Sequence, residues 1–182
     1  MEMSSFLSLQ NFVLSCFSLV GVVMLFDVSM KIKILVQTPY QSTASGGQLF
    51  VMLMIAVALI SLSTYIDMST ATMFGHESYG VLDTDPWIQN NSIQGFINGI
   101  GMQDEDLTAI SSIVVTLFMV IKVVGIGLIG YAIVNAYKYV DGAGSTMSGA
   151  FIVWLFIVGA AFFNIGEIIT ITMNTFGYSP GI

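Results

Sequence analysis

The chain has 182 residues, of which 55% are hydrophobic and 8% are charged, and its formal net charge is −7. A soluble domain carries about 25% charged residues, so this composition argues against a water-soluble globular protein. The negative balance also argues against sequence-specific nucleic-acid binding, because that function needs clustered basic residues that displace counterions from phosphates.

Four apolar stretches follow one another along the chain, and each has about the length of a transmembrane helix. A helix needs about 20 apolar residues to cross the hydrocarbon core of a bilayer. The strands of a membrane β-barrel would be shorter and would alternate in polarity, whereas a helix satisfies its own backbone polar groups in lipid. The sequence therefore predicts an all-α membrane protein with four transmembrane helices, over residues 11–34, 49–66, 107–134 and 150–171.

The connections between the stretches predict two tandem helical hairpins. Short polar turns with Gly or Pro lie at 38–47 and 141–145, and short links join antiparallel helices. A longer acidic segment without Lys separates the hairpins, and its apolar residues fit a short helix that lies along the membrane surface or against a neighbouring subunit. The predicted division is a first hairpin, an acidic linker and a second hairpin, at 1–75, 76–106 and 107–182.

The lysines predict the orientation of the hairpins. Lys31 and Lys33 lie at the first turn, and Lys138 lies at the second. Cytoplasmic loops are enriched in basic residues, so both turns are expected in the cytoplasm. Both termini and the acidic linker would then face the opposite side of the membrane.

The two hairpins are expected to be copies of one unit. Gly21 aligns with Gly125 at a separation of 104, and Gly47 aligns with Gly149 at 102. Each copy also ends in Phe-Gly, at 74–75 and 176–177. Because each copy would contain two spans, both would run in the same sense across the membrane, as a parallel repeat.

Glycines recur in the apolar stretches and are interpreted as helix-packing positions. Residues 125–130 spell a dinucleotide-binding fingerprint, but they lie inside an apolar stretch without a preceding strand or a following acidic residue. Small residues instead allow helices to approach closely in lipid. Close packing is therefore expected at Gly21, Gly125, Gly127, Gly130, Gly159 and Gly166.

Charged residues inside the apolar stretches are candidates for functional residues, because charges are costly in lipid. They are Asp27, Asp67, Lys122 and Glu167. Asp27 precedes Lys31 by four residues, which predicts an ion pair on one helix. Asp67 and Glu167 are expected to reach the membrane interface. Three interpretations stay open for Lys122: an ion pair across a helix contact, an extension to the interface, or a position in a water-filled lumen.

The chain carries no arrangement of residues that predicts catalysis. It has one His and one Cys, and no Ser-His-Asp or Cys-His set has a plausible organisation. Spaced metal ligands are also lacking. We therefore expect that the protein is not an enzyme and holds no cofactor or metal.

The chain resembles the IcmC/DotE family, small membrane proteins of type IVB secretion and conjugation systems with relatives called TraQ and TraR. The resemblance covers most of the chain and rests on short motifs beside the predicted helices: Lys31 and Lys33, Gly46-Gly47, Phe74-Gly75 and Asn174-Thr175-Phe176-Gly177. The sequence departs from the family in having no Arg in the turns and a long acidic central segment. Membership would imply a bacterial inner-membrane protein with periplasmic termini that works with other secretion or conjugation components.

Each hairpin also resembles a conjugative pilin of the TrbC/TraA kind. This resemblance implies a homo-oligomeric, pilin-like structural subunit of a ring, tube or pilus that transfers protein or DNA, with bound phospholipid and extraction into a pilus as further implications. Lys31, Lys33 and Lys138 would then line a conduit or contact lipid head groups. The alternatives are a small four-helix channel or transporter, and an accessory protein that stabilises a larger membrane partner.

Overall fold

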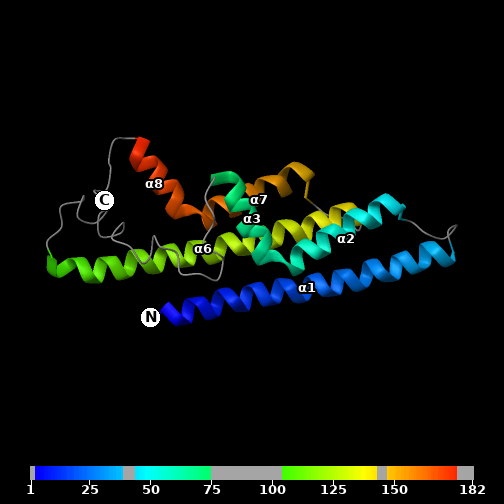
Figure 1. The fold of residues 1–182 in the computed structure, drawn as a ribbon, viewed down its shortest axis with the longest axis horizontal. Helices are drawn as coiled ribbons and strands as arrows, with labels where there is room; N and C mark the ends of the chain where they lie inside the picture. Colours follow the sequence, from blue (N-terminus) through cyan, green and yellow to red (C-terminus); the bar gives the residue numbers. More distant parts are fainter. Residues whose placement is uncertain (1–2, 39–43, 75–103, 143–146, 176–182) are drawn as a thin grey trace.

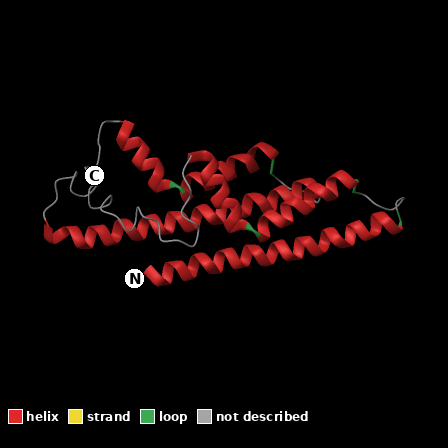
Figure 2. Ribbon diagram, in the orientation of Figure 1, coloured by secondary structure: helices red, strands yellow, loops and turns green. Residues whose placement is uncertain are grey.

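The computed structural model describes residues 3–38, 44–74, 104–142 and 147–175, and nearly all of these residues lie in α-helices (Figures 1 and 2). The predicted acidic linker at 76–106 lies outside this described part up to residue 103, and so do Gly75, Phe176 and Gly177 of the two Phe-Gly ends. In the described part, no residue lies in a strand.

Two long helices dominate the structure. Helix α1 spans Met3–Gln37 with 35 residues, and helix α6 spans Asp104–Asp141 with 38 residues. Both contain a segment that is long and apolar enough to cross a membrane, at Ser8–Gln37 and Thr116–Asp141. These helices extend beyond the predicted stretches, because polar residues at their ends continue the helices.

The second and fourth apolar stretches differ from the prediction, because each is broken into two shorter helices. Helices α2 (Gly46–Ile60) and α3 (Leu62–Phe74) meet at Ser61, and helices α7 (Gly149–Phe163) and α8 (Ile165–Thr175) meet at Asn164. The side-chain amide of Asn164 donates to the Ala160 carbonyl oxygen at 2.9 Å. Asn and Ser side chains compete with the backbone for hydrogen bonds, which weakens a helix at these positions.

The long helices run parallel, and each packs most extensively against the helix that follows it (Figure 1). Helix α6 also contacts α1 and α2, so the two halves of the chain share one core. This core lies between α1, α2 and α6, and its fully buried side chains include Val28, Met52, Leu59, Ile126 and Ile129.

The same close helix contact occurs once in each half. A Cβ added at Gly21 would lie 3.0 Å from the carbonyl oxygen of Ala56, and 2.9 Å from the nitrogen of Ile60. A Cβ added at Gly125 would lie 2.7 Å from the carbonyl oxygen of Gly159, and 2.6 Å from the nitrogen of Phe163. Glycine is therefore required where each long helix meets its partner.

These contacts define the correspondence between the halves. Gly21 and Gly125 are 104 residues apart, as aligned in the sequence, whereas α2 and α7 begin at Gly46 and Gly149, which are 103 apart. Both helices follow a serine N-cap whose side chain accepts a backbone N–H. The sequence alignment that paired Gly47 with Gly149 was thus wrong by one residue.

Candidate functional site

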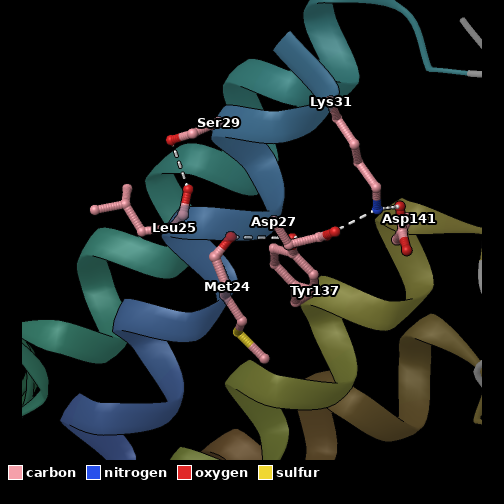
Figure 3. A network of polar contacts seen from close by, with 7 residues as sticks. All are labelled: Met24, Leu25, Asp27, Ser29, Lys31, Tyr137 and Asp141. Atoms are coloured by element: carbon pink, nitrogen blue, oxygen red, sulfur yellow. Dashed lines mark hydrogen bonds and ion pairs between the residues drawn. The ribbon is translucent and has the colours of Figure 1, made fainter. Parts of the chain in front are cut away.

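A polar cluster joins the two long helices near their C-terminal ends (Figure 3). The Lys31 ammonium lies 2.9 Å from Asp27 Oδ2 on the same helix, and it also pairs with Asp141 Oδ1 on α6. The Tyr137 hydroxyl donates to Asp27 Oδ2 at 2.7 Å, and it lies 3.3 Å from the Met24 carbonyl oxygen. One lysine and one tyrosine thus connect two carboxylates across the helix contact.

Helix geometry explains how these four side chains meet. Asp27 and Lys31 lie one turn apart on α1, and Tyr137 and Asp141 lie one turn apart on α6. The register of the two parallel helices places both pairs at the same level, where Lys31 meets Asp141 and Tyr137 meets Asp27. The side chains of Lys31 and Asp141 are 27% and 20% exposed, so water screens the ion pairs only in part.

The sequence predicted the pair within α1, and the structure contains it. Asp141 was interpreted as a turn residue, and Tyr137 was not considered. Their spacing of four residues matches that of Asp27 and Lys31 and could have suggested a second pair. The internal repeat gives no such hint, because the counterparts of Asp27 and Lys31 at a separation of 104 are Tyr131 and Asn135.

The three lysines near the turns have different surroundings. Lys31 contacts two carboxylates, whereas Lys33 and Lys138 are exposed near the same end of the structure. Of the residues expected to line a conduit or to contact lipid head groups, Lys33 and Lys138 are therefore accessible to a ligand. Lys31 pairs with one carboxylate on each long helix.

Lys122 lies on α6 close to the end of α7. Its ammonium is 4.7 Å from the centroid of the Phe163 ring, a cation–π contact. The three interpretations left open by the sequence stay open beside this contact. The contact places the charge beside the break between α7 and α8.

The glycines expected at helix contacts divide into two groups. The first group is in close contact with a neighbouring helix. Its members against backbone atoms are Gly21, Gly125 and Gly159. Gly130 lies against the Phe17 ring, where an added Cβ would be 2.5–2.6 Å from three ring atoms. At Gly127, an added Cβ would meet no described atom within 4 Å, so this position differs from the expected packing role.

The remaining predicted residues lie in the helices after the breaks. Asp67 is in α3 and Glu167 is in α8, and their side chains lie outside the described part of the structure. Gly166 is in the first turn of α8. Among the described residues, no group of three or more His, Cys, Asp or Glu side chains could hold a metal ion.

The variant Tyr137→Phe tests the contribution of the cluster to stability. It removes the hydroxyl that donates to Asp27 and leaves the buried ring in place. We expect a loss of about 1 kcal/mol in the free energy of unfolding, the typical net value of one hydrogen bond. Tyr139 is 56% exposed, so Tyr139→Phe is the matched control. Unfolding in detergent, followed by circular dichroism, measures both, and equal effects would contradict the prediction.

Comparison with known proteins adds no relative: no family model, curated protein or solved structure matches this chain.

Proposed function

We propose that the protein is an integral membrane protein with four spans arranged as two parallel-repeated hairpins. The observation that supports this best is the exposure of apolar side chains along both long helices. In the most apolar 18-residue segment of each long helix, only 17% of α1 and 33% of α6 is buried. The core helix of a soluble protein would be mostly buried. Phe12, Leu19 and Phe26 are 65–70% exposed, which suits contact with lipid tails.

In this proposal, each broken helix completes one span. Helices α2 and α7 have 15 residues each, about 22 Å at 1.5 Å per residue, and a bilayer core is about 30 Å thick. Helices α3 and α8 would supply the remaining length. Breaks in membrane helices are tolerated where neighbouring helices surround the freed backbone groups.

We further propose that the protein is a pilin-like structural subunit of a bacterial type IV secretion or conjugation apparatus. Tight glycine contacts within each half, and a shared core between the halves, build a rigid unit without an evident catalytic arrangement in the described residues. The extensive apolar surface can contact lipid and further copies of the chain. The subunit would then assemble in the inner membrane into a ring, tube or pilus, with Lys33 and Lys138 facing a conduit or lipid head groups.

Labelling of single cysteines tests the proposed topology. In a Cys16→Ser background, Lys33→Cys and Lys138→Cys are expected to react with a membrane-impermeant maleimide only in inverted inner-membrane vesicles. Ser4→Cys, near the N-terminus, is expected to react in intact spheroplasts. Labelling of Lys33→Cys and Lys138→Cys from opposite sides would contradict the parallel repeat, because it requires both turns on one side.

Fractionation tests the proposed assembly. Membranes and sheared surface material from producing cells are separated, and each fraction that holds the protein is viewed by electron microscopy. Rings, tubes or filaments containing the protein are expected. A small discrete complex that conducts ions when purified and reconstituted would instead favour the channel alternative.

A further inference from the structure

Helix α6 lies against the first half of the chain through one stripe of side chains, the docking stripe. Its members, which are three or four residues apart, are Ile126, Gly130, Ile133, Tyr137 and Asp141. The contacts of Gly130, Tyr137 and Asp141 with α1 fix the direction in which the stripe faces. Ile126 and Ile133 share this direction by helical spacing, and both belong to the core. The second half therefore docks on the first through this stripe.

The equivalent stripe on α1 is exposed. At the repeat separation of 104, the residues of this exposed stripe are Val22, Phe26, Ser29, Lys33 and Gln37, and all of them are exposed. Phe26 is 70% exposed, whereas its counterpart Gly130 is buried. Successive residues of a helix are turned by about 100°, so Val22 and Met24 lie about 200° apart around α1. Because Met24 lies beside Tyr137 of α6, the exposed stripe lies on the opposite side of α1 from that contact.

The surface that receives α6 is also fully covered in only one half. In the first half it lies on α1 and α2, where Met24 and Leu59 are buried. Their counterparts, at separations of 104 and 103, are Leu128 of α6 and Phe162 of α7. Leu128 is half-buried, and Phe162 is 38% exposed. The second half therefore presents a partly covered copy of the receiving surface.

The relation between the two halves can be repeated from one copy of the chain to the next. Gly21 and Gly125 make the same close contact with the helix that follows, so each half has the same internal arrangement. Repeating the relation places the exposed stripe of one copy on α6 and α7 of another. A head-to-tail contact of this kind joins two different surfaces, so each added copy offers a new site for the next.

We propose that the exposed stripe of α1 binds the α6–α7 surface of a second copy of this chain, as α6 binds the first half. A repeated unit cannot bury its apolar face alone, and stacking against a neighbour completes its core. This inference rests on the proposed assembly and names the two surfaces that would form it. Lys33 would then lie beside Tyr131, since their counterparts are Tyr137 and Asp27. The conduit or head-group role would fall to Lys138.

The offset between the halves predicts the form of the assembly. Tyr137 binds Asp27 at a separation of 110, whereas repeat counterparts are 104 apart. Each step therefore shifts the unit along the helix axis by six residues (110 − 104), or about 9 Å. A whole copy contains two steps, which amount to about 18 Å. A flat ring in one membrane plane requires no such shift, so this contact favours a tube or pilus over a ring.

Disulfide formation between single cysteines tests the inference in the full-length protein. Phe17 contacts Gly130 within the chain, and the counterparts of these residues are Ile121 and Phe26. In a Cys16→Ser background, the double variant Phe26→Cys/Ile121→Cys is therefore expected to cross-link between copies. Oxidation of membranes with copper phenanthroline should shift the monomer band to a ladder of dimers, trimers and larger species on a non-reducing gel.

The geometry within one chain excludes a cross-link inside the copy. Ala136 lies level with Phe26 at a separation of 110, and Ile121 lies 15 residues before it (136 − 121), or about 22 Å away along α6. A disulfide needs Cα atoms within about 7 Å. The matched control is Val23→Cys/Ile121→Cys, because Val23 is 60% exposed on α1 but outside the stripe, and it should stay monomeric. Coexpressed single variants Phe26→Cys and Ile121→Cys should give dimers only.

Electron microscopy of the same membranes separates failure of this contact from failure of the proposed function. Assemblies that form without the cross-link would overturn the head-to-tail contact and leave the proposed function standing. Equal cross-linking of the Val23→Cys control would overturn the contact as well, and so would dimers of Phe26→Cys alone, because they indicate a symmetric contact. Absence of both assemblies and cross-links would overturn the contact and the proposed function together, and would leave the exposed stripe to lipid.

Discussion

Replacing Gly125 with Ala is expected to lower the free energy of unfolding by about 2–4 kcal/mol. The new methyl group would lie 2.6 Å from the Phe163 nitrogen and 2.7 Å from the Gly159 carbonyl oxygen. Both are backbone atoms that cannot rotate away, so α7 would have to move as a unit. Overpacking against a fixed neighbour typically costs 1–3 kcal/mol and sometimes more.

Gly127→Ala is the matched control for this prediction. It makes the same chemical change two residues away on the same helix, where an added Cβ meets no described atom within 4 Å. Because Ala favours a helix by up to about 1 kcal/mol over Gly, this variant is expected to be neutral or slightly stabilising. Denaturation in detergent, followed by circular dichroism, measures both variants. Similar destabilisation of the two would show that the α6–α7 contact is not the cause.

Replacing Lys31 with Met is expected to weaken the contact between α1 and α6 and to cost about 1–3 kcal/mol. Asp27 and Asp141 would keep their negative charges without the ammonium that lies between them. Loss of one partner of a fully buried ion pair costs about 3–5 kcal/mol, and the partial exposure of this cluster reduces that figure. The measurement is the midpoint of unfolding in detergent.

A control and a repair variant separate the ion pairs from a general effect of lysine loss. Lys33 is exposed nearby on the same helix, and Lys33→Met is expected to change stability by less than about 0.5 kcal/mol. Adding Asp141→Asn to Lys31→Met should recover part of the loss, because it removes one of the two unbalanced charges. If the repair variant is less stable than Lys31→Met alone, the cluster does not act through charge compensation.

The sequence was sufficient to locate the long helices, because their apolar runs have no competing signal. It did not predict the breaks at Ser61 and Asn164, since a single Ser or Asn in an apolar run is also compatible with a continuous helix. Whether the helix breaks there depends on the packing of α3 and α8, which one-dimensional periodicity does not contain.

The sequence also predicted only part of the candidate site, namely the contact within α1 and not the contacts between α1 and α6. The pair of Asp27 with Lys31 follows from helical spacing alone. The pair of Lys31 with Asp141 depends on the register of α1 against α6, and part of that register is set by the Phe17 ring against Gly130. Such a contact joins residues far apart in the sequence, and no local pattern encodes it.

The level of the polar cluster has a consequence for the proposed membrane spans. Lys31 lies level with Asp141, but the counterpart of Lys31 in the repeat is Asn135. The two halves are therefore offset along the helix axis by six residues (141 − 135), or about 9 Å at 1.5 Å per residue. Lys122 precedes Asp141 by 19 residues (141 − 122), or about 28 Å of helix. That length nearly equals the hydrocarbon thickness of a bilayer, about 30 Å. If Asp141 lies at one water boundary in the proposed topology, Lys122 would reach the other. A thicker bilayer would then be disfavoured, because it would bury one of the two charges in hydrocarbon.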